Sequence, residues 1–104
     1  MIINYQYSLY SAKLPLKNKK IDLNKANAFF YKNGFKVVFK ELQDFEKYGF
    51  KRLDLTIDYY KLQVYANGSI IIHVKDETKD HSNVLLLLNL IEKIIIKNYL
   101  LKQI

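Results

Sequence analysis

Two histidines and the carboxylates between them are the side chains best placed to do chemistry. His73 and His81 bracket Asp76, Glu77 and Asp80. Imidazoles with carboxylates are a ligand set for divalent metal ions. The spacing matches no defined metal motif, and polar turns between a strand and a helix have the same composition. We therefore predict no metal site and no cofactor, and keep a metal-dependent enzyme using both histidines as an alternative.

The remaining candidates for catalysis are sparse. Asp54 and Asp58 share one face of an expected strand but stand about 13 Å apart, too far to share a proton or a metal. The chain has no glycine-rich phosphate loop, no His-Glu zinc pair on a helix, and no cysteine. We predict a protein that is not an enzyme. Without cysteine nothing indicates an oxidising compartment, and with no signal peptide we expect a cytoplasmic location.

The positive charge is concentrated in the first forty residues. They carry eight lysines and one acid, whereas residues 41–104 carry nine basic and nine acidic residues. Eight of the fifteen aromatic residues lie in the same part of the chain. Lysines neutralise phosphate and exposed rings stack on bases, so this pattern predicts non-specific nucleic-acid binding. The predicted contacts are phosphate-binding lysines and one stacking tyrosine: Lys13, Lys17, Lys19, Lys20, Lys25 and Tyr10.

Two other interpretations of the lysines remain open. Lysine, isoleucine, asparagine and tyrosine all have A/T-rich codons, so a biased genome can supply the charge without a polyanion partner. Arg52 is the only arginine, which argues against sequence-specific base recognition. The alternative function is a small adaptor or inhibitor, of the kind that phages and mobile elements carry, docking as a dimer on an acidic host-protein surface.

The clearest local structure is a hairpin over 61–75, with Asn67-Gly68 as a two-residue type I′ turn. That loop length pairs Tyr65 with Ile70 and makes both faces of the hairpin largely apolar, which predicts that the hairpin lies centrally in the sheet or is covered on both faces. Residues 52–58 alternate cleanly and predict another strand with Leu53, Leu55 and Ile57 inward. Residues 3–9 predict one more strand by the same rule.

Residues 22–48 allow two structures. Phenylalanine, tyrosine and valine around Asn33-Gly34 favour a second hairpin over 28–40, followed by a short helix over 41–48. The alternative begins a helix at Asp22 as N-cap, ends it at Asn33-Gly34, and starts a second helix at Phe35. The segment 13–20 is expected to be an exposed basic loop around the single proline.

A helix is expected from Asp80 or Ser82 to the end of the chain. Fourteen of the twenty-one residues from 84 to 104 are apolar, more than one sheet contact requires. Either the rest of the chain buries this surplus, or the helix or the opposite sheet face forms a homodimer or partner interface. The predicted interface residues are Leu87, Leu90, Ile91, Ile94 and Ile95.

Together these patterns predict one α+β domain over 1–104. We expect an antiparallel sheet of about four to six strands with a long C-terminal helix packed on one face. Polar residues interrupt the longest apolar run, so no membrane span is expected. The predicted partners are nucleic acid or an acidic protein surface, with a second copy of the chain.

Overall fold

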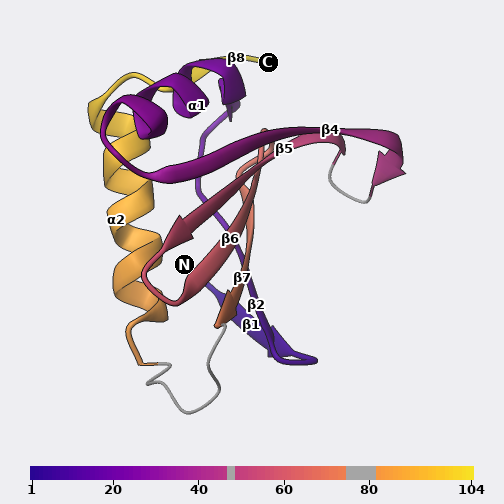
Figure 1. Cartoon of the computed structure of the whole chain (residues 1–104), viewed down its shortest axis with the longest axis vertical. Coiled ribbons are helices and arrows are strands. Elements are labelled where there is room, and N and C mark those ends of the chain that lie inside the picture. The colour runs from indigo at the N-terminus through magenta and orange to yellow at the C-terminus, as the bar shows by residue number, and fades with distance from the viewer. Residues whose placement is uncertain (47–48, 75–81) are drawn as a thin grey trace.

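Eight strands and two helices form in the residues that the computed structural model describes, namely 1–46, 49–74 and 82–104, with side chains omitted at 42–46, 49 and 50. Six strands make one antiparallel sheet (Figure 1). Their order across it is β1 (Ile3–Gln6), β2 (Leu9–Lys13), β7 (Ser69–Val74), β6 (Tyr60–Tyr65), β5 (Gly49–Ile57) and β4 (Lys36–Glu46). The predicted α+β class is therefore confirmed.

Both helices pack on the same face of this sheet, which we call the covered face. They are α1 (Leu23–Lys32) and α2 (Val84–Lys97). One core joins α2 residues such as Ile91 to sheet residues such as Leu62 and Ile72, all at most 1% exposed. A second, two-stranded sheet pairs β3 (Lys19–Ile21) with β8 (Leu101–Gln103). Residues 19–21 and 101–103, far apart in the sequence, therefore pair beside α1 (Figure 1).

The 61–75 hairpin is present within the described residues, but its register differs by one residue from the prediction. Val64, not Tyr65, lies opposite Ile70. The loop has three residues, with only Gly68 in the left-handed region (φ 91°), and Ser69 N–H donates to Asn67 Oδ1 at 2.8 Å. This geometry is a type I turn followed by a glycine bulge. The shift places Leu62, Val64, Ile70, Ile72 and Val74 on one face and leaves Tyr65 and Ile71 on the other. The hairpin lies centrally, between β2 and β5, so that alternative of the prediction is confirmed.

Asp22 begins a helix, which decides the ambiguity in residues 22–48. The Asp22 carboxylate accepts the backbone N–H of Lys25 at 3.1 Å, and α1 buries Leu23, Ala26 and Phe30 at helical spacing. The predicted hairpin over 28–40 is wrong, and the alternative is right for this first helix. Residues 36–46 form β4, so the short helix predicted over 41–48 is wrong as far as residue 46, and residues 47 and 48 lie outside the described part.

Two further boundaries differ from the prediction. Residues 3–9 are not one strand, because Tyr7 and Ser8 adopt positive φ (53° and 63°) and turn the chain between β1 and β2, which form a hairpin over 3–13. The C-terminal helix ends at Lys97 instead of the chain end, since Tyr99 adopts φ 56° and β8 follows. Of the two N-caps considered for this helix, Asp80 lies outside the described residues, and Asn83 stands in place of Ser82. The predicted strand over 52–58 is confirmed as part of β5.

Candidate nucleic-acid interface

Alternating leucines hold the basic segment 13–18 against the body of the protein. Leu14 and Leu16 are buried, whereas Lys13, Pro15 and Lys17, which alternate with them, are exposed. The Leu14 N–H donates to the carbonyl of Gly68 at 2.9 Å. The segment expected to be an exposed loop is therefore anchored by its two leucines and presents its cations to solvent.

A tight turn without glycine sets the direction of the next lysines. Lys19 N–H donates to the carbonyl of Leu16 at 3.2 Å, and the two residues between, Lys17 and Asn18, have φ of 48° and 62°. Asparagine tolerates this left-handed backbone, whereas lysine in it costs roughly 1–2 kcal/mol. Such strain persists only where surrounding contacts impose it, and it is found at functional sites.

The small second sheet places two more cations face to face. Lys20 lies directly opposite Lys102, and Lys19 lies opposite Gln103. Like charges in a directly opposed cross-strand pair destabilise the pairing. The repulsion is relieved when an anion binds between or above the two ammonium groups. Lys102 was missed from the sequence because only the pairing of β3 with β8 brings it here.

Four lysines line one hollow beside these elements, with a volume of ≈ 490 Å³. We call it the lysine hollow. No acidic side chain lies among its lining residues, which are Lys13, Leu14, Leu16, Lys17, Asn18, Lys19, Lys20, Ala66, Asn67 and Ile104. Ammonium groups and asparagine amides are both suitable donors to phosphate oxygens. Four of the five lysines predicted to bind phosphate are therefore brought together.

The other two predicted contact residues lie elsewhere. Lys25 is exposed on the first turn of α1 and does not line the hollow. Tyr10 lies opposite Ile72 on the covered face and is partly buried, with its ring 4.4 Å from that of Tyr5. Burial, with a smaller contribution from Tyr5, raises the pKa of the Tyr10 phenol. Tyr10 is therefore not placed to stack on a base held at the lysine hollow.

The residues predicted for a helix interface divide between the core and the surface. Leu87, Ile91 and Ile95 are buried within this chain and offer no free apolar surface, whereas Ile94 is partly buried against the same core. Leu90 is 47% exposed. It shares the outer side of α2 with other exposed apolar residues, namely Leu85, Leu86 and Ile96. The homodimer itself stays a prediction.

Of the residues in the histidine hypothesis, His73 lies in the described part of the chain. His73 is exposed on β7, while Asp76, Glu77, Asp80 and His81 lie outside the described residues. Among the residues that are described, no group of three or more histidine and acidic side chains could hold a metal ion. Neither α1 nor α2 is long and apolar enough to cross a membrane.

Comparison with known proteins found no family model, no curated protein and no solved structure that matches this chain.

Proposed function

We propose that this protein binds nucleic acid without sequence preference, through phosphate contacts at the lysine hollow. The observation that carries the proposal is the convergence of Lys13, Lys17, Lys19 and Lys20 on one hollow with no acidic lining residue. The opposed pair of Lys20 and Lys102 beside it supports the same conclusion. Lysine is a point charge that recognises phosphate without the bidentate geometry by which arginine reads guanine, so the binding is non-specific.

The first test is the salt dependence of binding. Fluorescence anisotropy with labelled oligonucleotides should show binding at low salt that weakens steeply as salt rises. The double variant Lys17→Gln/Lys19→Gln should lower the slope of log K against log salt by about 1.5, since each lost phosphate contact lowers it by about 0.7–0.9.

A matched variant controls for net charge. Lys32→Gln/Lys93→Gln removes the same charge from the exposed surfaces of α1 and α2, outside the lysine hollow. It should leave the slope nearly unchanged. Absence of binding at low salt, or equal losses in the two double variants, would contradict the proposal.

The opposed lysine pair gives a second test, with effects of opposite sign. Lys102→Gln removes the cross-strand repulsion with Lys20, so it should raise the free energy of unfolding of the free protein by about 0.5 kcal/mol. The same change should weaken oligonucleotide binding, because one cation near the hollow is lost. A variant that binds as tightly as the original chain would show that this pair takes no part in binding.

A second candidate function is a protein-binding adaptor or inhibitor that acts as a dimer. The outer side of α2 favours it, because Leu85, Leu86 and Leu90 are each about half exposed or more. The measurement is the mass in solution by light scattering, for the original chain and for Leu86→Lys/Leu90→Lys. A dimer that the double variant converts to monomer supports this candidate, and a monomeric original chain contradicts it.

A further inference from the structure

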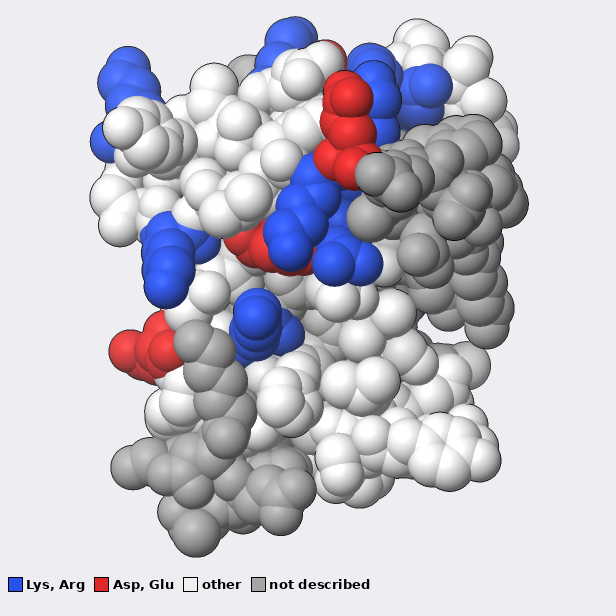
Figure 2. All heavy atoms as spheres, turned by 45° about the vertical axis from the view of Figure 1, so that its right-hand side comes forward, with Lys and Arg blue, Asp and Glu red and all other residues white. Residues whose placement is uncertain are grey.

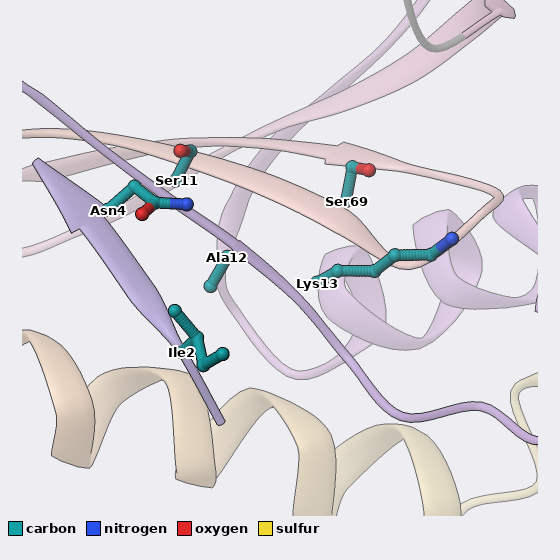
Figure 3. A pocket seen from close by; sticks show the side chains of 6 residues that line it. All are labelled: Ile2, Asn4, Ser11, Ala12, Lys13 and Ser69. Atoms are coloured by element: carbon teal, nitrogen blue, oxygen red, sulfur yellow. The ribbon is translucent and has the colours of Figure 1, made fainter. Parts of the chain in front are cut away.

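One face of the six-stranded sheet has no helix on it in the described part of the chain, and we call it the open face. Strand alternation places Lys61 and Gln63 of β6 on this face, whereas Leu62 and Val64 point into the core. At the edge near β1, Figure 3 shows Ser11 and Ser69 on one side of the sheet and Ala12 on the other. The open face is therefore a surface that folding leaves available for a partner.

The registers align the cations of this face in two rows that run across the strands. In the first row Lys40 lies opposite Arg52, Arg52 opposite Tyr65, and Lys13 opposite Ser69.

In the second row Lys36 lies opposite Thr56, Thr56 opposite Lys61, and Lys61 opposite His73. The two rows are four residues apart along each strand, or about 13 Å. An intermediate row of Val38, Asp54, Gln63 and Ile71 lies between them.

The first row is continuous with the lysine hollow. Lys13 lines the lysine hollow and also a second hollow of ≈ 500 Å³ at the β1 edge, where Asn4, Ser11 and Ser69 add polar groups (Figure 3). A polyanion bound at the lysine hollow therefore reaches further cations in both rows. Basic side chains also outnumber acidic ones on the side of the molecule drawn in Figure 2.

Asp54 is the one acidic side chain between the rows among the residues described, and two cations hold it. Arg52 Nε donates to Asp54 at 2.9 Å, and Lys40 Nζ lies 3.2 Å from the same carboxylate. Partial burial acts to lower the pKa of Arg52, but the hydrogen bond to the Tyr65 hydroxyl and the charge of Asp54 outweigh it and hold the pKa above its ordinary value. Arg52 is thus a fixed, preoriented cation, and the net charge of the face stays positive.

A hollow suited to a base lies between the two rows. It has a volume of ≈ 350 Å³ and is lined by Leu9, Lys61, Gln63, Ile71 and His73. Leu9 and Ile71 supply apolar contact, while the Gln63 amide and the His73 imidazole can hydrogen-bond to a base edge. The Tyr65 hydroxyl donates to Gln63 Oε1 at 3.3 Å, which orients the amide and leaves its NH₂ group as a donor. Gln63 lies two residues along β6 from the first row, or about 6.7 Å. A phosphate on that row and a base in this hollow are therefore separated by about one nucleotide.

The shape of the face selects a single strand over a duplex. Neighbouring strands of a sheet are rotated by roughly 20–25°, so the four steps from β2 to β4 accumulate about 90°. Figure 1 shows this twist, since β4 and β5 run in a different direction from β1 and β2. A duplex is stiff over about 50 nm and can follow only part of such a surface, whereas a single strand can follow all of it. The four strand spacings span about 19 Å, or five to six stacked nucleotides at roughly 3.4 Å each.

We infer that the open face binds a single-stranded nucleic acid, which runs from the lysine hollow along the row of Lys13, Arg52 and Lys40 and places a base in the hollow at Gln63. This inference rests on the proposed function and extends it to a strand class and a path. It differs from simple phosphate binding because Gln63, a side chain without charge, contacts a base.

The test separates charge from base contact by using two probes, a labelled 12-nucleotide single strand and inorganic polyphosphate, which has no bases. Lys40→Gln/Lys61→Gln removes one cation from each row and should weaken binding of the single strand roughly tenfold at low salt, and of the matching duplex much less. Gln63→Leu and His73→Ala keep the formal charge and should weaken the single strand about threefold to tenfold while leaving polyphosphate affinity unchanged. Thermal unfolding identifies any variant whose fold is disturbed. If one of Gln63→Leu and His73→Ala does not fold, the other still tests the base contact.

Each contrary outcome points to a different error. If the 12-mer binds, the Lys17→Gln/Lys19→Gln variant weakens it, and the open-face variants bind like the original chain, then this inference is overturned and the proposed function stands. Equal or tighter binding of the duplex overturns the choice of a single strand. Equal losses of oligonucleotide and polyphosphate in Gln63→Leu and His73→Ala overturn the base contact. If no oligonucleotide binds at low salt, the proposed function fails, and an acidic protein becomes the better occupant of this face.

Discussion

The two faces of the sheet are made by the same strands, but the covered face packs in the core and the open face carries charged and polar side chains. In β7, Ile70, Ile72 and Val74 lie in the core under the helices, while Ile71 and His73 between them lie on the open face. Every second residue therefore contributes mainly to stability, and the residues between are free to carry charge and polar groups. The comparison shows that the number of apolar residues in a strand does not tell how many of its faces are covered.

The largest expected effect compares two neighbouring isoleucines on opposite faces. Ile72→Ala should lower the free energy of unfolding by about 2–5 kcal/mol, because it opens a cavity in a fully packed core. Ile71→Ala removes the same atoms from a partly exposed position and should cost about 1 kcal/mol. Denaturant unfolding of the two variants measures both values. Similar losses would show that the open face is covered after all.

A smaller effect is expected where the hairpin loop meets the segment that carries the lysine hollow. A Cβ at Gly68 would lie 2.9 Å from Leu16 Cδ1 and 3.2 Å from the Leu14 carbonyl oxygen, and φ is already positive there. Gly68→Ala should therefore cost about 2–4 kcal/mol, from backbone strain and overpacking together.

Gly34→Ala is the matched control for Gly68→Ala. Gly34 also has positive φ (82°), but a Cβ there meets no atom within 4 Å, so its loss should be only about 1 kcal/mol. Gly68→Ala should in addition weaken oligonucleotide binding, since Leu14 and Leu16 position the lysines of the hollow. Equal stability losses in the two variants would mean that the 14–16 segment is not packed on the loop.

The smallest expected effect is at the edge of the covered face, where Tyr10 is partly buried. Burial raises its pKa in the folded state, so the stability gained by burying the neutral phenol is complete at neutral pH. That stability should be lost as pH rises through the raised pKa of Tyr10. Thermal unfolding between about pH 8 and 11 should show a decline that is smaller in Tyr10→Phe and unchanged in Tyr7→Phe, which alters an 87% exposed ring. The same decline in all three proteins would mean that Tyr10 does not cause it.

The two Asn-Gly pairs show how far local pattern carries. Asn67-Gly68 lies in a hairpin loop, and Asn33-Gly34 ends α1 with Phe35 N–H donating to the Phe30 carbonyl at 2.9 Å. Both glycines have positive φ, so the dipeptide correctly marks a chain reversal in each case. What it does not indicate is the structure that comes before it, which at Asn33 depends on the Asp22 cap and the buried face of α1.

The end of α2 was harder to predict from the sequence than the end of α1, because no glycine follows Asn98 as Gly34 follows Asn33. Asn98 Nδ2 donates to the Ile94 carbonyl at 2.9 Å, as Asn33 Nδ2 donates to the Phe29 carbonyl at 2.8 Å. Tyr99 then takes the left-handed position that Gly34 holds in α1. A repeated asparagine at this position was the available clue. The pairing of β8 with β3 compensates for the cost of placing a tyrosine in this conformation.

The sequence by itself determined the α+β class, the covered side of β5, the 61–75 hairpin and the concentration of charge before residue 40, because each depends on local alternation or composition. Only the tertiary structure decided the hairpin register, the strand in place of the predicted helix over 41–46, and the pairing of Lys20 with Lys102. A one-residue change of register exchanges the faces of a strand at no local cost, so global packing must choose it. Contacts between segments far apart in the sequence, such as β3 and β8, leave no local pattern, because the energy that forms them comes from the shared core.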